Sequence, residues 1–87
     1  MLLDVEERVV DFLQGLPPKQ FRQVVNKMFS LMTMTPHDSR ALHGSPYSAV
    51  DIGEYRICYR VDKDIVRVVL IGKRNDDEVY RAIARLR

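Results

Sequence analysis

The sequence predicts an α+β domain in which a helical hairpin packs on a small, mainly antiparallel sheet, in the order β-α-α-β-β-β-α. Two observations support this prediction. Apolar residues recur at helical spacing in the first third of the chain, and they alternate with polar residues after residue 54. With 87 residues, the chain can build one domain around one small core, so residues 1–87 are expected to form a single unit.

The first helix is expected to begin near Asp4, whose carboxylate can cap it with Glu7 as the capping-box partner. Leu2 to Val5 is equally compatible with a short edge strand that leads into the helix, and the sequence does not decide between the two. The helix should end near Gly15. Its apolar face consists of Val9, Val10, Phe12, Leu13 and Leu16.

A second helix is expected to start at Pro17-Pro18, because proline fits the first turn of a helix. Its apolar face would run until Thr35-Pro36 ends it. That face consists of Phe21, Val24, Val25, Met28, Phe29 and Met32. Because the link between the two helices is so short, they should form an antiparallel hairpin.

The second half of the chain predicts a meander of three strands. The first spans about Tyr47 to Ile52, and Gly53-Glu54 turns the chain into a strand whose apolar face begins at Tyr55. This strand is expected to be half-buried, with Arg56, Cys58 and Arg60 on a polar face. Tyr55 and Tyr59 fall on its apolar side and are expected to pack in the core.

The third strand of the meander is expected over Ile65 to Ile71, after a turn at residues 62–64. It is apolar at six of seven positions, which indicates a central strand covered on both faces. Asn75 or Asp76 would then cap a closing helix. In that helix Val79, Ile83 and Leu86 form an apolar stripe, while Arg81, Arg85 and Arg87 lie mainly away from it.

The charge is small but unevenly distributed. The formal net charge is +2, and residues 44–87 carry all the excess of basic over acidic residues.

Cys58 is the one cysteine, so the chain can form no internal disulfide and no multi-cysteine metal site. The N-terminus has acidic residues where a signal peptide requires basic ones, so we expect a cytoplasmic protein that is neither exported nor inserted into a membrane.

The residues best suited to chemistry lie in the last third. Gly72-Lys73-Arg74 follows the third strand of the meander, Tyr80 lies on the closing helix, and Arg56 lies on the neighbouring strand. This set would bring fixed positive charge and one phenol together at the end of the sheet. Such a site suits a phosphodiester better than a metal or a cofactor, so neither is expected.

The order of these motifs resembles the RelE toxins of the RelE/ParE toxin–antitoxin superfamily over the whole chain. The resemblance rests on Leu-Pro-Pro-Lys between the helices, on Leu42-His43-Gly44, and on the strand from Gly53 to Tyr59. It also rests on Ile71-Gly72-Lys73-Arg74 followed by Glu78-Val79-Tyr80. Together, in this order and at these separations, the motifs are fairly specific for the superfamily.

The resemblance implies a toxin that cuts messenger RNA in the ribosomal A site without a metal and leaves a 2′,3′-cyclic phosphate. A cognate antitoxin protein would hold it inactive. By motif position, Arg56 would neutralise the phosphate, Arg74 would stabilise the leaving oxygen, and Tyr80 would stack on or orient the nucleotide. Lys73 and His43 would contribute to RNA binding.

The chain departs from the RelE pattern on the first strand of the meander. RelE proteins with strong cleavage carry lysines there, whereas this stretch has none, and Asp51 stands where many relatives have an arginine. His43 is the best substitute for the general base, because its unperturbed pKa is near 6.5. Asp51 is a poorer one, because a carboxylate repels the phosphate.

Two other functions are compatible with these departures. One is a non-nuclease toxin that inhibits DNA gyrase, as ParE relatives do. The other is an antitoxin-binding homologue whose cleavage activity has weakened. The missing lysines favour both, while Lys73, Arg74 and Tyr80 favour the nuclease.

Overall fold

A computed structural model describes residues 2–33, 39–42, 44–74 and 78–85 of the chain, without the side chain of Glu78. Within these residues, the elements are β1 (Leu2–Val5), α1 (Glu7–Gln14), α2 (Pro18–Ser30), β2 (Arg40–Ala41), β3 (Ser48–Ile52), β4 (Tyr55–Asp62), β5 (Ile65–Lys73) and α3 (Glu78–Arg85). The predicted α+β fold class and order are confirmed, with the two-residue β2 as an addition that the sequence did not indicate.

The sheet has the strand order β1-β5-β4-β3-β2, and all neighbours except β1 and β5 are antiparallel. The two-residue turn at Gly53-Glu54 joins β3 to β4, and Gly53 has a φ of 57°, which favours glycine. β5 lies inside the sheet between β1 and β4, as its apolar run predicted.

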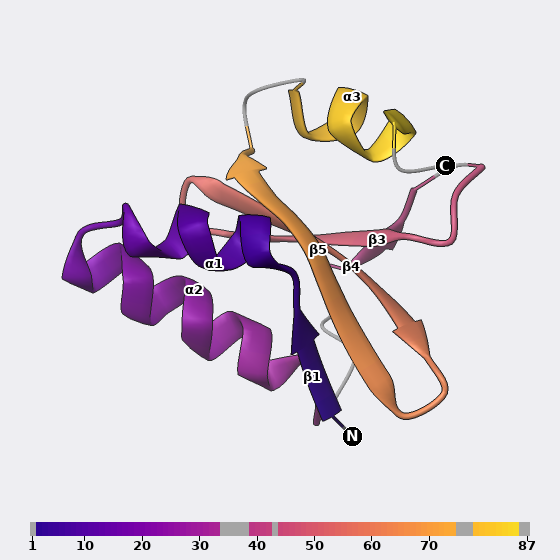
Figure 1. The fold of residues 1–87 in the computed structure, drawn as a ribbon, viewed down its shortest axis with the longest axis horizontal. Helices are drawn as coiled ribbons and strands as arrows, with labels where there is room; N and C mark the ends of the chain where they lie inside the picture. Colours follow the sequence, from indigo (N-terminus) through magenta and orange to yellow (C-terminus); the bar gives the residue numbers. More distant parts are fainter. Residues whose placement is uncertain (1, 34–38, 43, 75–77, 86–87) are drawn as a thin grey trace.

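The helical hairpin covers one face of the sheet (Figure 1). Val9 of α1 and Val24 of α2 are fully buried against Ile57, Val66 and Val68 of the sheet. Tyr59 is buried in this cluster, and Tyr55 packs against it with its ring edge toward Phe12, 5.8 Å between centroids. The predicted core roles of both tyrosines are therefore confirmed.

The opposite face is covered by α3, which corrects the expectation that β4 has an open polar face. Cys58 is fully buried and Arg56 is only 8% exposed, because Val79 and Ile83 of α3 pack over this side. Periodicity shows which residues share a face, but it does not show whether another element covers that face. Figure 1 shows α3 on the side of the sheet away from α1 and α2.

The N-terminal ambiguity is resolved in favour of a strand. Leu2–Val5 pairs with β5 in parallel, so Asp4 belongs to β1 and does not cap α1. The residue at the cap position is Glu6, and its side chain makes no capping hydrogen bond. α2 ends at Ser30, earlier than its apolar pattern suggested. The expected stop at Thr35-Pro36 and the expected cap at Asn75 or Asp76 lie outside the described residues.

Gly72 allows α3 to approach the sheet closely. A Cβ atom built on Gly72 would lie 2.5 Å from Cγ2 of Val79, a separation that real Cβ atoms do not show. Val79 is 3% exposed, so it has little room to move away. The absence of a side chain at this position therefore sets the distance between α3 and β5.

We expect Gly72→Ala to destabilise the fold by about 1–3 kcal/mol, because the new methyl group overpacks the contact with Val79. Urea unfolding followed by circular dichroism measures this free energy. Gly15→Ala is the matched control, since its Cβ would lie 3.5 Å from the nearest atom, an ordinary contact. Equal stability of the two variants would contradict the proposed close packing.

Candidate functional site

Arg56 is the centre of the candidate site. It lies on β4 opposite Asp51 of β3 and Gly72 of β5, on the face of the sheet that α3 covers. Among the described residues, Arg56 is the charged side chain that the fold buries. A buried charge is stable only when it is paired, so its partners determine what the site can do.

Arg56 is held on two sides. Its Nε donates to Oδ1 of Asp51 at 2.7 Å and its Nη2 donates to Oδ2 at 3.2 Å, which makes a forked, two-bond ion pair. Its Nη1 donates to the hydroxyl oxygen of Tyr80 at 2.5 Å, and the guanidinium carbon lies 5.1 Å from the Tyr80 ring centroid. A guanidinium carries five N–H donors, so two of them remain for another acceptor.

Asp51 is surrounded by positive charge. The hydrogen bond from Arg56 lowers the pKa of Asp51 below its ordinary value of 3.8, and the charges of Arg56, Arg40 and Arg74 act in the same direction. Arg40 Nη2 lies 3.8 Å from Asp51 Oδ2. Among the described residues, three guanidinium groups thus act on one carboxylate, and an excess of positive charge of this kind favours the binding of an anion.

Arg74 and Arg40 are the exposed cations of this group. Arg74 is exposed in the turn after β5, and its main-chain N–H donates to the carbonyl oxygen of Glu54 at 2.9 Å. Its charge helps to lower the pKa of Asp51, so it acts on the Arg56–Asp51 pair from nearby. The structure brings Arg56 and Tyr80 into direct contact, and Arg74 acts through its charge on their neighbour Asp51. The catalytic roles of these three residues stay predictions. Tyr80 is 38% exposed and borders this face.

Lys73 is not part of this group. Lys73 is exposed and pairs with Tyr55, whose ring belongs to the face of the helical hairpin. Because side chains alternate along a strand, Lys73 leaves the sheet on the side away from Arg56. His43 lies outside the described residues.

Two contacts of this site were not predicted from the sequence. They are the ion pair between Asp51 and Arg56 and the approach of Arg40 to Asp51. Asp51 was considered from the sequence as a possible base, whereas in the structure its carboxylate is the ion-pair partner of Arg56. The signal was present: a two-residue turn at Gly53-Glu54 places residues 51 and 56 opposite each other. Arg40 reaches the site through β2, which is too short to be predicted from a pattern.

Cys58 lies on the same face but is chemically protected. It is fully buried, and burial raises the pKa of its thiol to about 12. The thiolate is the reactive form of cysteine, and with this raised pKa almost no thiolate is present at neutral pH.

In the part of the chain that the structure describes, no three His, Cys, Asp or Glu side chains gather as a metal site would require. No described helix is long and apolar enough to cross a membrane.

We expect Cys58 to resist thiol reagents in the folded protein. Reaction with an aromatic disulfide reagent at pH 8 should proceed only as fast as the protein unfolds, and adding urea should release the full thiol signal. The absorbance of the released reagent measures both rates. Fast labelling without urea would show that the thiol is accessible and that α3 does not seal this face.

Comparisons with known proteins rest on structure. No protein-family model matches the sequence, and no curated protein matches it. A mutant of the E. coli toxin RelE in the free state superposes with a TM-score of 0.78 and 23% identity, covering 97% of this chain and 94% of that one. The RelBE2 toxin–antitoxin complex from Mycobacterium tuberculosis gives a TM-score of 0.74 and 22% identity, with coverages of 86% and 92%.

An archaeal structure agrees with these two. The RelB-RelE antitoxin–toxin complex from Methanococcus jannaschii gives a TM-score of 0.65 and 17% identity, covering 91% of this chain and 96% of that one. The coverage is nearly complete in both directions, so the likeness concerns whole domains. The resemblance noted in the sequence is thereby confirmed at the level of architecture, and this chain has the fold of the RelE toxins.

Proposed function

We propose that the chain is the toxin of a type II toxin–antitoxin system and that it cuts messenger RNA on the ribosome. The observation that supports this most is the positive face formed by Arg56 and Arg74 beside the half-exposed ring of Tyr80. A phosphate and an adjacent base are the ligands that such a combination suits. The whole-length likeness to RelE toxins points to the same function.

The proposed reaction is attack of a ribose 2′-hydroxyl on the adjacent phosphorus. The P–O5′ bond breaks, and the products are a 2′,3′-cyclic phosphate and a free 5′-hydroxyl. The exposed Arg74 would bind the phosphate oxygens and stabilise the charge that develops on the leaving oxygen. The buried Arg56 would act on the phosphate through its charge and its two remaining N–H donors. Tyr80 would hold the nucleotide by stacking.

The base that accepts the 2′-hydroxyl proton must lie elsewhere than Asp51. The lowered pKa of Asp51 makes its carboxylate a weak proton acceptor, and both of its oxygens already accept hydrogen bonds from Arg56. We therefore propose His43 as the general base, on its chemistry and on its position in the RelE pattern.

An antitoxin is the proposed protein partner. Three of the similar structures are described as toxin–antitoxin complexes. In this chain the outer side of the helical hairpin exposes Val10 (39%), Phe21 (39%) and Phe29 (52%), which would suit the apolar face of a partner helix. The cationic face around Arg56 and Arg74 of this chain would suit an acidic segment of the same partner.

Primer extension on a message translated in a purified ribosomal system tests the proposal. We expect cuts at codon positions when ribosomes, message and the chain are all present, and no cuts when ribosomes are omitted. Equal cutting of naked RNA would contradict ribosome dependence. Intact message in every reaction, with the chain folded by circular dichroism, would remove the nuclease.

A second function is favoured by one observation. Arg56, which would neutralise the phosphate, is engaged by Asp51, and the strand lysines of active relatives are absent. A toxin that inhibits DNA gyrase cuts no RNA, so it needs neither a phosphate-neutralising Arg56 nor the strand lysines. Relaxed or linearised plasmid in a gyrase assay, together with intact message, would support this alternative.

A further inference from the structure

A pocket lies on the flank of α3 opposite Tyr80. It has a volume of about 330 Å³ and is lined by residues of β5 and α3, beside their close contact at Gly72 and Val79. Its lining residues are Leu70, Ile71, Gly72, Val79, Arg81, Ala82 and Arg85. Tyr80 reaches Arg56 on β4, so the opposite flank of α3 faces away from β4, beyond β5. The pocket is therefore distinct from the site described above.

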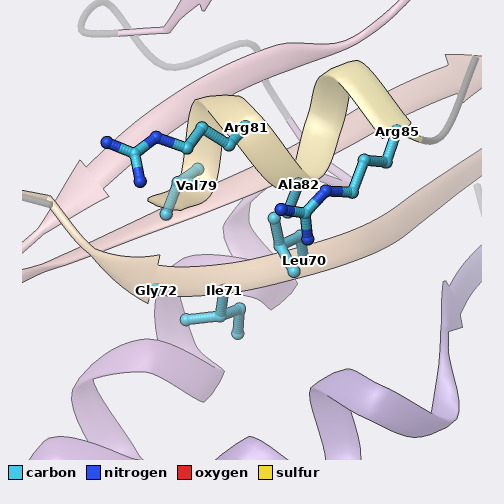
Figure 2. A pocket seen from close by; sticks show the side chains of 7 residues that line it. All are labelled: Leu70, Ile71, Gly72, Val79, Arg81, Ala82 and Arg85. Carbon is cyan, nitrogen blue, oxygen red and sulfur yellow. The ribbon is translucent and has the colours of Figure 1, made fainter. Parts of the chain in front are cut away.

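Two guanidinium groups border an apolar floor in this pocket. Figure 2 shows Leu70 and Ala82 facing each other, with the Arg85 side chain folded back beside them and the Arg81 side chain extending past Val79. Arg81 and Arg85 lie four residues apart on α3, so both project from one side of the helix. Neither has an ion-pair partner among the described residues, and both are exposed.

The main chain of β5 forms the remaining wall. β1 pairs with β5 only as far as Val68, so beyond that residue this edge of β5 has no strand partner in the described part of the chain. Main-chain N–H and C=O groups of an unpaired edge can bind the polar edge of a ligand. The pocket thus combines an apolar floor, a polar edge and two cations.

These features fit a nucleotide. A volume near 300 Å³ is at the lower end of the range for small-ligand pockets. Arginine binds phosphate oxygens with two parallel hydrogen bonds, and its planar guanidinium also stacks on bases, which lysine cannot do.

We propose that this pocket binds one nucleotide of single-stranded RNA next to the scissile linkage, with Arg81 on its phosphate and Arg85 stacked on its base. The inference rests on the proposed RNA-cutting function and extends it: RNA would cross the start of α3, with one nucleotide on each flank of the helix. An acidic peptide is the competing occupant. RNA is favoured because arginines bind phosphate and stack on bases, and here two of them adjoin an apolar floor in a pocket of about 330 Å³.

Titration of the ¹⁵N-labelled protein with a 2′-O-methyl RNA tetranucleotide tests the subsite. This probe has no free 2′-hydroxyl, so the protein cannot cut it. We expect amide shifts at Leu70, Gly72 and Ala82 in addition to shifts around Arg56. Arg81→Ala/Arg85→Ala should weaken binding by about tenfold or more, and should make the salt dependence less steep by about one unit in slope.

The matched control is Lys19→Ala/Arg22→Ala, which removes the same charge from exposed positions on α2. We expect it to change affinity less than threefold. Equal loss in both double variants would overturn the subsite, because only overall charge would then matter. Stronger shifts at the same amides with a Glu-Leu hexapeptide than with RNA would also overturn it, in favour of a peptide groove.

The subsite and the proposed function fail separately. Message cut on ribosomes, with no RNA-dependent shift at Leu70, Gly72 or Ala82, would remove the subsite and leave the nuclease. Intact message on ribosomes would remove the nuclease, whereas the titration would still report whether RNA enters the pocket.

Discussion

Replacing Arg74 with alanine is expected to lower the rate of ribosome-dependent cleavage by about 10²-fold or more, the usual effect of removing a group that stabilises developing charge. The effect should appear in kcat more than in KM, because the charge on the leaving oxygen develops only in the transition state. Single-turnover primer extension at saturating chain concentration measures it.

The Arg74 variant gives a clean test because the fold does not depend on this side chain. It is exposed, and the contact that the turn makes, from its main-chain N–H to Glu54, survives the substitution. Arg22→Ala is the control, since Arg22 is exposed on α2, away from the site. Arg74→Lys should recover part of the rate, because charge remains without the forked geometry. Unchanged cleavage by Arg74→Ala would remove Arg74 from the mechanism.

Replacing Asp51 with alanine is expected to destabilise the fold by about 2–3 kcal/mol. The substitution leaves the Arg56 guanidinium, whose side chain is 10% exposed, without its ion-pair partner. Breaking a fully buried pair costs about 3–5 kcal/mol. The cost is smaller here because the Asp51 side chain is 29% exposed and water can reach the gap. Urea unfolding measures the difference.

Two further variants separate this effect from ordinary loss of charge. Asp62→Ala breaks a surface ion pair between Arg60 and Asp62, in which the side chains are 38% and 45% exposed, respectively. This change should lower the free energy of unfolding by less than about 0.5 kcal/mol. Arg56→Met added to Asp51→Ala should recover stability, because no unpaired buried charge remains. If Asp51→Ala is as mild as Asp62→Ala, Arg56 is not held by its carboxylate partner.

The same ion pair predicts a pH dependence. The folded state lowers the pKa of Asp51 from 3.8, so the unfolded chain binds a proton more readily than the folded one. The contribution of Asp51 to stability is therefore fully present above about pH 4 and is lost as the pH falls through the lowered value. The stability gap between wild type and Asp51→Ala should be constant from pH 5 to 7 and should shrink in more acidic solution.

The sequence determined the local elements because their patterns are local. Helical spacing predicted both hairpin helices, alternation predicted β4, and Gly53-Glu54 predicted the turn that sets the register of β3 on β4. Motif order then selected Arg56, Arg74 and Tyr80, and the structure shows Arg56 and Tyr80 in contact. The choice between a strand and a cap at Asp4 needed β5, its distant partner.

Tertiary structure decided what covers each face and which charges meet. Burial of Cys58 and Arg56 depends on α3 packing closely over Gly72, a contact between elements that no pattern within either element encodes. The link from Arg40 to Asp51 depends on a two-residue strand with no periodic signal of its own. A sequence pattern specifies which side of an element is apolar, whereas the free energy of packing whole elements together decides which element covers that side.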